Sequence, residues 1–353
     1  MITLAESVFS PPGVSAEVVA AAARLRQSAE NLRDGCVWPV KIALATRLFH
    51  QHLDLFASDA DPARPLSSSL AASSRILEGA GAGAALLRFE PDAAPVDDVG
   101  AIYGDAWTQY TDQLYFDESS ARLRERLVRN DVDPERLFGG RRVLDAGCGG
   151  GNYTIAIAGF GADEVVGIDV GEDGLAVARD KAKRVPYGRR VTYRYGSAAK
   201  IPLADASVDV VWSNSVVHVT GQYETCIREA ARVLKPGGTL FLYVDGRMGL
   251  FELLMNSLLT MLIGVPRSLT QHYLARLGIH PGRIGWMLAN FYVPYERRPK
   301  AQVEALLREC GLGDLRQLTR GAPDEPAEQI SRGAPFANVK YGEGPLRYLA
   351  IRV

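Results

Sequence analysis

The stretch Val143-Leu-Asp-Ala-Gly-Cys-Gly-Gly-Gly-Asn152 decides the fold. It begins as an apolar strand, places glycines at 147, 149 and 151, and leads into a helical pattern. A turn of this kind binds ligands in open α/β sheets, because a backbone without Cβ atoms can approach a ligand closely. A dinucleotide fingerprint would need its third glycine at Asn152, and Asp145 would repel a pyrophosphate. The loop therefore favours a ligand that carries positive charge.

Short β-branched runs alternate with helical stretches on both sides of this loop, from Arg141 onward. The runs are RRVLDAG, EVVGIDV, VTYRYGS, VDVVWSN and TLFLYVD. Strands that alternate with helices indicate a parallel sheet with crossover helices, which is an α/β fold.

The first hundred residues show no strand pattern and are rich in Ala, Leu and Arg. Predicted helices cover Ala16 to Arg33, Val37 to Ala57 and Ser67 to Phe89, and a polar linker follows at Pro91 to Gly100. The alternating glycines from Gly79 follow a helix rather than a strand, so we interpret them as a helix end. We expect a helical module over 1–95 and a ligand-binding domain over 100–353.

The charge balance argues against a nucleic-acid partner. The 353 residues include 40 basic and 41 acidic side chains, which gives a formal charge of −1 and no large positive field. Four arginines at 122, 124, 126 and 129 alternate with Glu125, and we expect them to form a solvated helix face.

The cysteines and the hydropathy pattern exclude further classes. Cys36, Cys148, Cys226 and Cys310 are far apart and form no C-x-x-C pair, so we predict no metal site and no disulfide framework, and a reducing cytoplasm. The most apolar segment, Gly249 to Val265, is interrupted by charged and polar residues, and we predict no membrane span. No secretory signal is visible at the N-terminus.

Four motifs occur in an order that resembles the class I S-adenosylmethionine-dependent methyltransferases. The glycine loop is followed by EVVGIDV ending in Asp169, by 195–211, and by RVLKPGG at 232–238. The resemblance implies a doubly wound, mostly parallel seven-stranded sheet whose antiparallel edge comes from LRQLTRG and RYLAIRV. It also implies S-adenosyl-L-methionine as cofactor, S-adenosyl-L-homocysteine as product, and Asp169 as acceptor for the ribose hydroxyls.

The resemblance implies a set of cofactor-binding residues along these motifs. They are Asp145, Gly147, Cys148, Gly149, Gly151, Asp169, Val170, Ser197, Ala198 and Ser213. Ser197 departs from the family, which usually has an acidic residue there to accept the adenine amino group. A hydroxyl can also accept that hydrogen bond, at about 1 kcal/mol less than a charged acceptor.

Methyl transfer needs an aligned nucleophile and, for some acceptors, a base. His218 lies just past the fourth predicted strand and is the candidate catalytic base, since an ordinary imidazole pKa near 6.5 suits proton acceptance. Its alternative role is to pack against or orient the loop. Upstream, Tyr110 is the preferred aromatic cover of the cofactor, and Tyr103 and Trp107 are candidates for substrate contact, with core packing as the alternative for each.

The chain is extended after the fifth predicted strand, where this family inserts substrate-specific elements. We predict a helical lid over about 247–298 before a helix at Lys300 to Cys310. His272, Tyr292 and Tyr295 are candidate substrate residues, and a hydrophobic dimer face is the alternative use of the same elements.

Three interpretations of function remain open. The first is methylation of an oxygen or nitrogen of a medium-sized, partly apolar or aromatic metabolite, in specialised natural product biosynthesis. The second is a peptide or carrier-bound acceptor recognised by residues 1–95, and the third is a non-catalytic scaffold subunit. An RNA base methyltransferase is disfavoured, because Ser213-Asn214-Ser215-Val216 stands where that class has an Asn/Asp-Pro-Pro-aromatic run.

Overall fold

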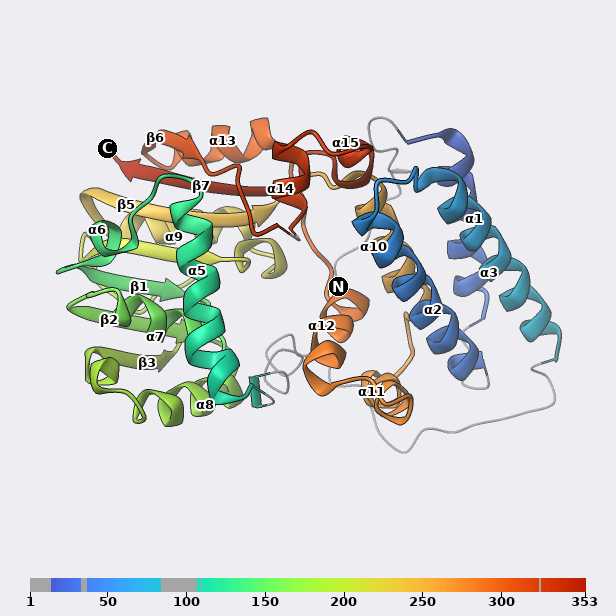
Figure 1. The fold of residues 1–353 in the computed structure, drawn as a ribbon, viewed down its shortest axis with the longest axis horizontal. Helices are drawn as coiled ribbons and strands as arrows, with labels where there is room; N and C mark the ends of the chain where they lie inside the picture. Colours follow the sequence, from blue (N-terminus) through green and yellow to red (C-terminus); the bar gives the residue numbers. More distant parts are fainter. Residues whose placement is uncertain (1–13, 33–36, 84–106, 109, 324) are drawn as a thin grey trace. The chain divides into compact units, whose positions relative to one another are not determined.

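A seven-stranded β-sheet carries the glycine loop (Figure 1). The computed structural model describes residues 14–32, 37–83, 107–108, 110–323 and 325–353. The strands are β1 (Arg142–Ala146), β2 (Glu164–Asp169), β3 (Val191–Tyr195), β4 (Val208–Asn214), β5 (Leu234–Asp245), β6 (Leu312–Gln317) and β7 (Pro345–Arg352). Their order is β3-β2-β1-β4-β5-β7-β6; β1 to β5 pair in parallel, and β7 is antiparallel to β5 and β6. The doubly wound, mostly parallel sheet expected from the sequence is confirmed, including its antiparallel edge.

The strand order reverses beside β1, and this reversal positions the site. The chain passes from β1 to β2 and β3 on one side, then returns to β4 and β5 on the other. A crevice forms at the carboxyl ends of the strands where the order reverses, because the crossover helices there cover opposite faces of the sheet. The glycine loop follows β1 and therefore lies at this crevice.

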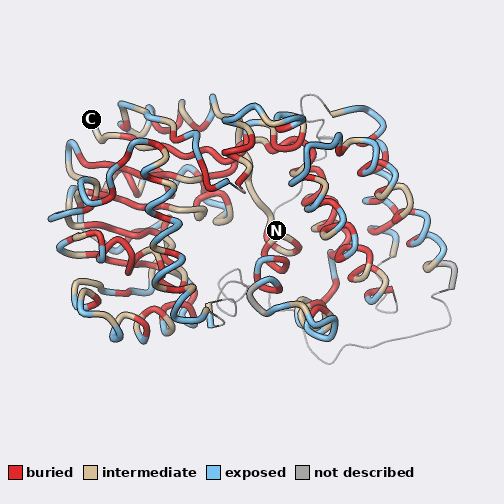
Figure 2. Tube along the Cα trace, viewed as in Figure 1, coloured by how far each residue is buried: buried red, intermediate tan, exposed pale blue. Residues whose placement is uncertain are grey.

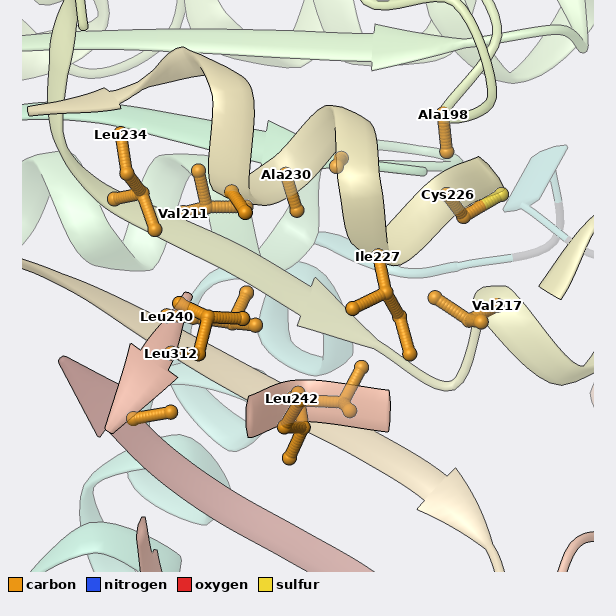
Figure 3. Close-up of a cluster of buried hydrophobic side chains, with 14 of the residues drawn as sticks. Ala198, Val211, Val217, Cys226, Ile227, Ala230, Leu234, Leu240, Leu242 and Leu312 are labelled. Atoms are coloured by element: carbon orange, nitrogen blue, oxygen red, sulfur yellow. The ribbon is translucent and has the colours of Figure 1, made fainter. Parts of the chain in front are cut away.

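Helices cover both faces of the sheet. On one face, α9 (Tyr223–Val233) and α13 (Lys300–Glu309) contribute apolar side chains to one buried cluster with β4 and β5, in which Figure 3 labels Ile227 of α9 and Leu240 and Leu242 of β5. On the other face, α5 (Ser119–Val128), α6 (Pro134–Phe138) and α7 (Asn152–Gly159) pack around Trp212, whose ring stacks on Phe241 with centroids 3.6 Å apart. The crossover helix α8 (Glu172–Ala182) packs on β3.

Among the described residues, seven further helices form a separate compact unit. They are α1 (Ala16–Glu30), α2 (Trp38–Ala57), α3 (Ala63–Gly83), α10 (Gly249–Met261), α11 (Arg267–Arg276), α12 (Pro281–Tyr292) and α15 (Ala337–Tyr341). Within the described residues the three predicted N-terminal helices are present; the predicted ends at Arg33 and at 84–89 lie outside that part. Helix α3 continues through Gly79 and Gly81, so no phosphate loop is present there. The helices inserted after β5 pack with α1 and α2 in this unit, and Figure 2 shows their buried faces. Within the described part of the chain, no helix is long and apolar enough to cross a bilayer.

Two of the four arginines in and just after α5 correct one expectation, whereas Arg122 and Arg124 are exposed as expected. Arg126 contacts Glu325 with 2.7 Å between Nε and Oε1, and Arg129 pairs with Glu328, so neither lies on a solvated face. Both glutamates are buried; Glu325 directly precedes α14 (Pro326–Ser331) and Glu328 lies in it, about 200 residues away in sequence. The alternation of charges around Glu125 could not reveal these partners, because nothing local distinguishes a solvated arginine from one that meets a distant carboxylate.

Candidate functional site

A cleft of about 420 Å³ opens at the carboxyl ends of β1 to β4. Its volume lies in the ~300 to 1,000 Å³ range of small-molecule sites. It is lined by Trp107, Gly147, Gly149, Asp169, Val170, Gly171, Gly174, Gly196, Ser197, Ala198, Asn214, Ser215, Val216, Val219, Thr220 and Gln222. The structure therefore brings together residues that follow four separate strands.

The glycine loop lines one wall of the cleft because side chains are excluded there. Gly147 has φ +88° and Gly149 has φ +53°, which are left-handed conformations that favour glycine. A Cβ on Gly147 would lie 2.4 Å from Val216, and one on Gly149 would lie 2.8 Å from the Trp107 ring. These glycines are thus required by both backbone conformation and close packing.

Asp169 links the glycine loop to the turn after β2. Its Oδ2 accepts a hydrogen bond from the Gly149 N–H and its Oδ1 accepts one from the Gly171 N–H, each at 2.8 Å. Burial raises the pKa of this carboxyl, and the backbone donors oppose that shift. A carboxylate oxygen can accept more than one hydrogen bond, so Asp169 retains acceptor capacity toward the cleft.

Asp145 lies beneath the cleft and does not line it. Its carboxylate is buried, accepts a hydrogen bond from Thr154 Oγ1 at 2.6 Å, and has a pKa raised to about 7 by burial and by the charge of Asp169. Any role toward a cationic ligand is therefore exerted by its charge and not by contact.

Asp145→Asn should stabilise the ligand-free protein at neutral pH. Between the usual carboxyl pKa of 3.8 and about 7, the unfolded chain ionises before the folded one, so Asp145 lowers the free energy of unfolding as pH rises through that window. Above about pH 7 the whole difference between the two pKa values counts against the wild type, so the variant should exceed it by about 4 kcal/mol. Urea unfolding at pH 4 to 8 measures this difference; equal pH profiles for the two proteins would refute it.

Trp107 covers the glycine loop, whereas its sequence neighbours are placed differently. Its ring lies against Gly149 and Gly150, and its Nε1 is buried without a hydrogen-bond partner among the described residues. Tyr110 packs edge-on against Trp107 with centroids 5.0 Å apart but does not line the cleft. Tyr103 lies outside the described residues.

His218 does not occupy the position expected of a base. The ring is fully buried and does not line the cleft; Nδ1 accepts a hydrogen bond from the Asp245 N–H at 2.8 Å, and Nε2 lies 3.2 Å from Ser215 Oγ. Burial lowers its pKa to about 4. This placement argues against a catalytic base and favours the alternative, a histidine that orients the loop.

The other predicted cofactor residues divide into two groups. Val170, Ser197 and Ala198 line the cleft, and Ser197 Oγ accepts a hydrogen bond from the Ala199 N–H at 3.1 Å. Three predicted residues lie behind the cleft wall instead of lining it: Cys148, Gly151 and Ser213. The described residues include no cluster of three or more side chains placed to hold a metal ion.

The predicted substrate residues after β5 are divided between the two compact units. His272 is exposed on α11, and Tyr292 of α12 shares a hydrogen bond with Thr270 at 2.6 Å. Both belong to the helical unit. Tyr295 belongs to the sheet unit, where its ring lies 5.0 Å from the His218 ring.

The residues after β4 are the part of the site that sequence reasoning missed. Asn214 ends the strand, Ser215 and Val216 follow it directly, and Thr220 and Gln222 precede α9. The available signal was their place after a strand at the reversal of strand order, where ligand-contacting loops occur.

The residues present fit S-adenosylmethionine. Asp169 supplies an acceptor for ribose hydroxyls, the glycine loop supplies a wall that a Cβ would fill, and Asp145 adds a carboxyl behind that wall. Among the described residues that line the cleft, Asp169 is the only ionisable one. No basic side chain there would repel the sulfonium or ammonium group of the ligand.

Comparison with known proteins agrees with this geometry. Residues 144–242 match the family model described as a methyltransferase domain. The chain is 37% identical over 172 residues to 27-O-demethylrifamycin SV methyltransferase of Amycolatopsis mediterranei, covering 44% of this chain and 62% of that protein. It is 30% identical over 168 residues to O-methyltransferase cnsE of Penicillium expansum, covering 44% and 60%. The chain thus spans about six tenths of the length of these curated relatives.

Among solved structures, geranyl diphosphate C-methyltransferase from Streptomyces coelicolor A3(2), in complex with Mg²⁺, geranyl diphosphate and S-adenosyl-L-homocysteine, is 16% identical. The match has a TM-score of 0.42 and covers 66% of this chain and 78% of that one.

Proposed function

Residues 144–242 belong to the methyltransferase-domain family, and from this premise we propose that the chain transfers a methyl group from S-adenosyl-L-methionine to an oxygen or nitrogen of a medium-sized, partly apolar metabolite. The observation that carries the proposal is Asp169, which faces the cleft while anchored to Gly149 and Gly171. Two relatives named for O-methylation support oxygen as the acceptor atom and specialised biosynthesis as the setting.

The cofactor would supply a methyl group bonded to a positively charged sulfur. A lone pair of the acceptor would attack the methyl carbon in line with the C–S bond, and the sulfur would leave. Asp169 would hold the ribose hydroxyls of the cofactor, and Ser197 and Ala198 would border its adenine ring. The protein needs no covalent nucleophile, so its main tasks are to align the acceptor and exclude water.

The lining after β4 supports a neutral acceptor. Val216 and Val219 offer apolar contact, and Ser215, Thr220 and Gln222 offer uncharged hydrogen-bonding groups. A site with few polar groups among apolar ones suits an organic molecule with one or two hydroxyls better than a phosphate or a charged peptide.

The helical unit is the proposed acceptor-recognition part of the chain. The helices inserted after β5 share its core with the N-terminal helices, so removal of 1–95 would also expose the buried leucines of α10. Point variants in this unit are therefore a cleaner test of its role than truncation. A homodimer and a cytoplasmic location stay predictions.

Two measurements test the proposal. Calorimetric titration should give micromolar binding of both S-adenosylmethionine and S-adenosylhomocysteine. Tritium from labelled S-adenosylmethionine should then enter members of a panel of phenols and macrocyclic alcohols. Folded protein that binds neither ligand would overturn the proposal.

Ser197→Asp should tighten cofactor binding about three- to tenfold. One aspartate oxygen can keep the hydrogen bond from the Ala199 N–H, and the other adds a charged acceptor for the adenine amino group. Calorimetry with S-adenosylhomocysteine measures the change. The gain should vanish with S-inosylhomocysteine, which lacks that amino group, and an equal gain for both ligands would contradict the explanation.

A further inference from the structure

Ser215 is held in an uncommon conformation at the cleft. It follows β4 directly, has φ +64°, and lines the cleft. A left-handed backbone is strained for a residue that carries a Cβ, and such strain is found most often at functional sites. The Ser215 N–H donates a hydrogen bond to the Tyr243 carbonyl at 3.0 Å, which fixes the backbone from which the side chain extends.

The ring of His218 determines the direction of the Ser215 hydrogen bond. Nδ1 accepts from the Asp245 N–H and therefore carries no proton. A neutral imidazole has one proton, which must then be on Nε2, and Nε2 lies 3.2 Å from Ser215 Oγ. Hence the ring donates and the serine oxygen accepts.

The surroundings of the ring keep it neutral and in place. Asp245 and Arg297 face it with opposite charges, and Tyr295 and Tyr243 pack against it with ring centroids 5.0 and 6.4 Å away. The His218 carbonyl also accepts from the Glu296 N–H at 2.7 Å. The ring therefore has neither solvent access nor a free lone pair with which to take a proton.

We propose that Ser215 donates a hydrogen bond to an oxygen of the methyl acceptor, and that His218 is the positioning residue that fixes this direction. The inference rests on the proposed function and deepens it. With Oγ already accepting from the ring, the hydroxyl proton of Ser215 points away from His218, and Ser215 lines the cleft.

The ligand chemistry that follows is an acceptor oxygen with two lone pairs, as in an alcohol, phenol or enol. One lone pair accepts from Ser215 while the other forms the new O–CH₃ bond, and the electron pair of the broken C–S bond returns to sulfur. The acceptor proton leaves to water and not to His218.

Two histidine variants separate positioning from base catalysis. In His218→Gln the amide nitrogen can replace Nε2 as donor to Ser215, whereas in His218→Asn the shorter amide can replace only Nδ1 as acceptor from Asp245. Neither variant can act as a base. We expect His218→Asn and Ser215→Ala each to lower kcat/KM for the acceptor found in the isotope screen about tenfold, and His218→Gln to lower it no more than about threefold.

All three variants should bind S-adenosylhomocysteine within about twofold of the wild type. The double variant Ser215→Ala/His218→Asn should lose no more than either single variant, because both remove the same interaction. Equal, severe loss in His218→Gln and His218→Asn would overturn the proposal in favour of a base.

Nuclear magnetic resonance tests the hydrogen-bond direction without any acceptor. Long-range ¹H–¹⁵N correlations of the five histidines, with His218 assigned by its loss in His218→Gln, should show the Nε2–H tautomer from pH 5.5 to 8. An Nδ1–H tautomer, or titration near pH 6.5, would overturn the proposal. Failure of cofactor binding would overturn the proposed function and leave this tautomer result to stand by itself.

Discussion

Asp169→Ala is expected to weaken binding of S-adenosylmethionine by at least about a hundredfold. Hydrogen bonds to a charged group are worth about 1.5 to 3 kcal/mol each, and the ribose hydroxyls would lose two of them. The carboxylate also bridges the N–H groups of Gly149 and Gly171, so its removal leaves two backbone donors without their acceptor at the wall of the cleft. Calorimetric titration of the variant beside the wild type measures the loss.

Asp173→Ala is the matched control for this experiment. Asp173 is exposed in the first turn of α8 and does not line the cleft, so this variant removes an equal charge close by without changing the site. Its affinity should stay within about twofold of the wild type. Asp169→Asn separates the loss of charge from the loss of backbone hydrogen bonds, because the amide oxygen can still accept one of these bonds but carries no charge. Wild-type affinity in Asp169→Ala would show that the cofactor does not use this carboxylate.

The sheet and half of the site were predictable because their signals are local. A strand, a glycine loop and a helix follow one another within 143–159, and a parallel sheet then brings the end of β2, with Asp169, beside that loop. Gly147 and Gly149 line the cleft as expected, because a Cβ at either position would clash with its neighbours. The parallel pairing of β1 and β2 therefore allowed the position of Asp169 beside the glycine loop to be predicted from the sequence.

His218 shows where such reasoning ends. Its place after β4 predicted proximity to the cleft, but its role depends on where each ring nitrogen points. The Asp245 N–H that meets Nδ1 is 27 residues away and is part of the backbone, so it leaves no trace in residue identity. Only the three-dimensional arrangement distinguishes an acceptor nitrogen from a free base.

Glu325→Gln is expected to lower the free energy of unfolding by about 3 kcal/mol at pH 7. The carboxylate is buried and meets two arginines: Arg126 Nε lies 2.7 Å from Oε1, and an Arg347 amino nitrogen lies 2.5 Å from Oε2. Arg347 is also buried, and its Nε has no partner among the described residues. A neutral amide would leave the buried Arg347 and the half-buried Arg126 without a counter-charge, which is why the cost exceeds that of a surface ion pair. Urea unfolding followed by hydrogen exchange in β5 and β7 reports on the sheet unit.

The acid dependence of stability provides an independent check on the same carboxylate. Burial alone would raise its pKa, but the charges of Arg126 and Arg347 hold the pKa below the usual 4.5. The pair therefore stabilises the protein above pH 4.5 and is lost as pH falls below it, so the wild type should lose more stability on acidification than Glu325→Gln. Adding Arg126→Met to Glu325→Gln should restore part of the loss, because one uncompensated cation is removed.

Glu135→Gln is the control variant: it breaks an exposed ion pair with Arg124 and should change the free energy of unfolding little. If Glu325→Gln were no more costly than Glu135→Gln, the buried cluster would not stabilise the edge formed by β5 and β7.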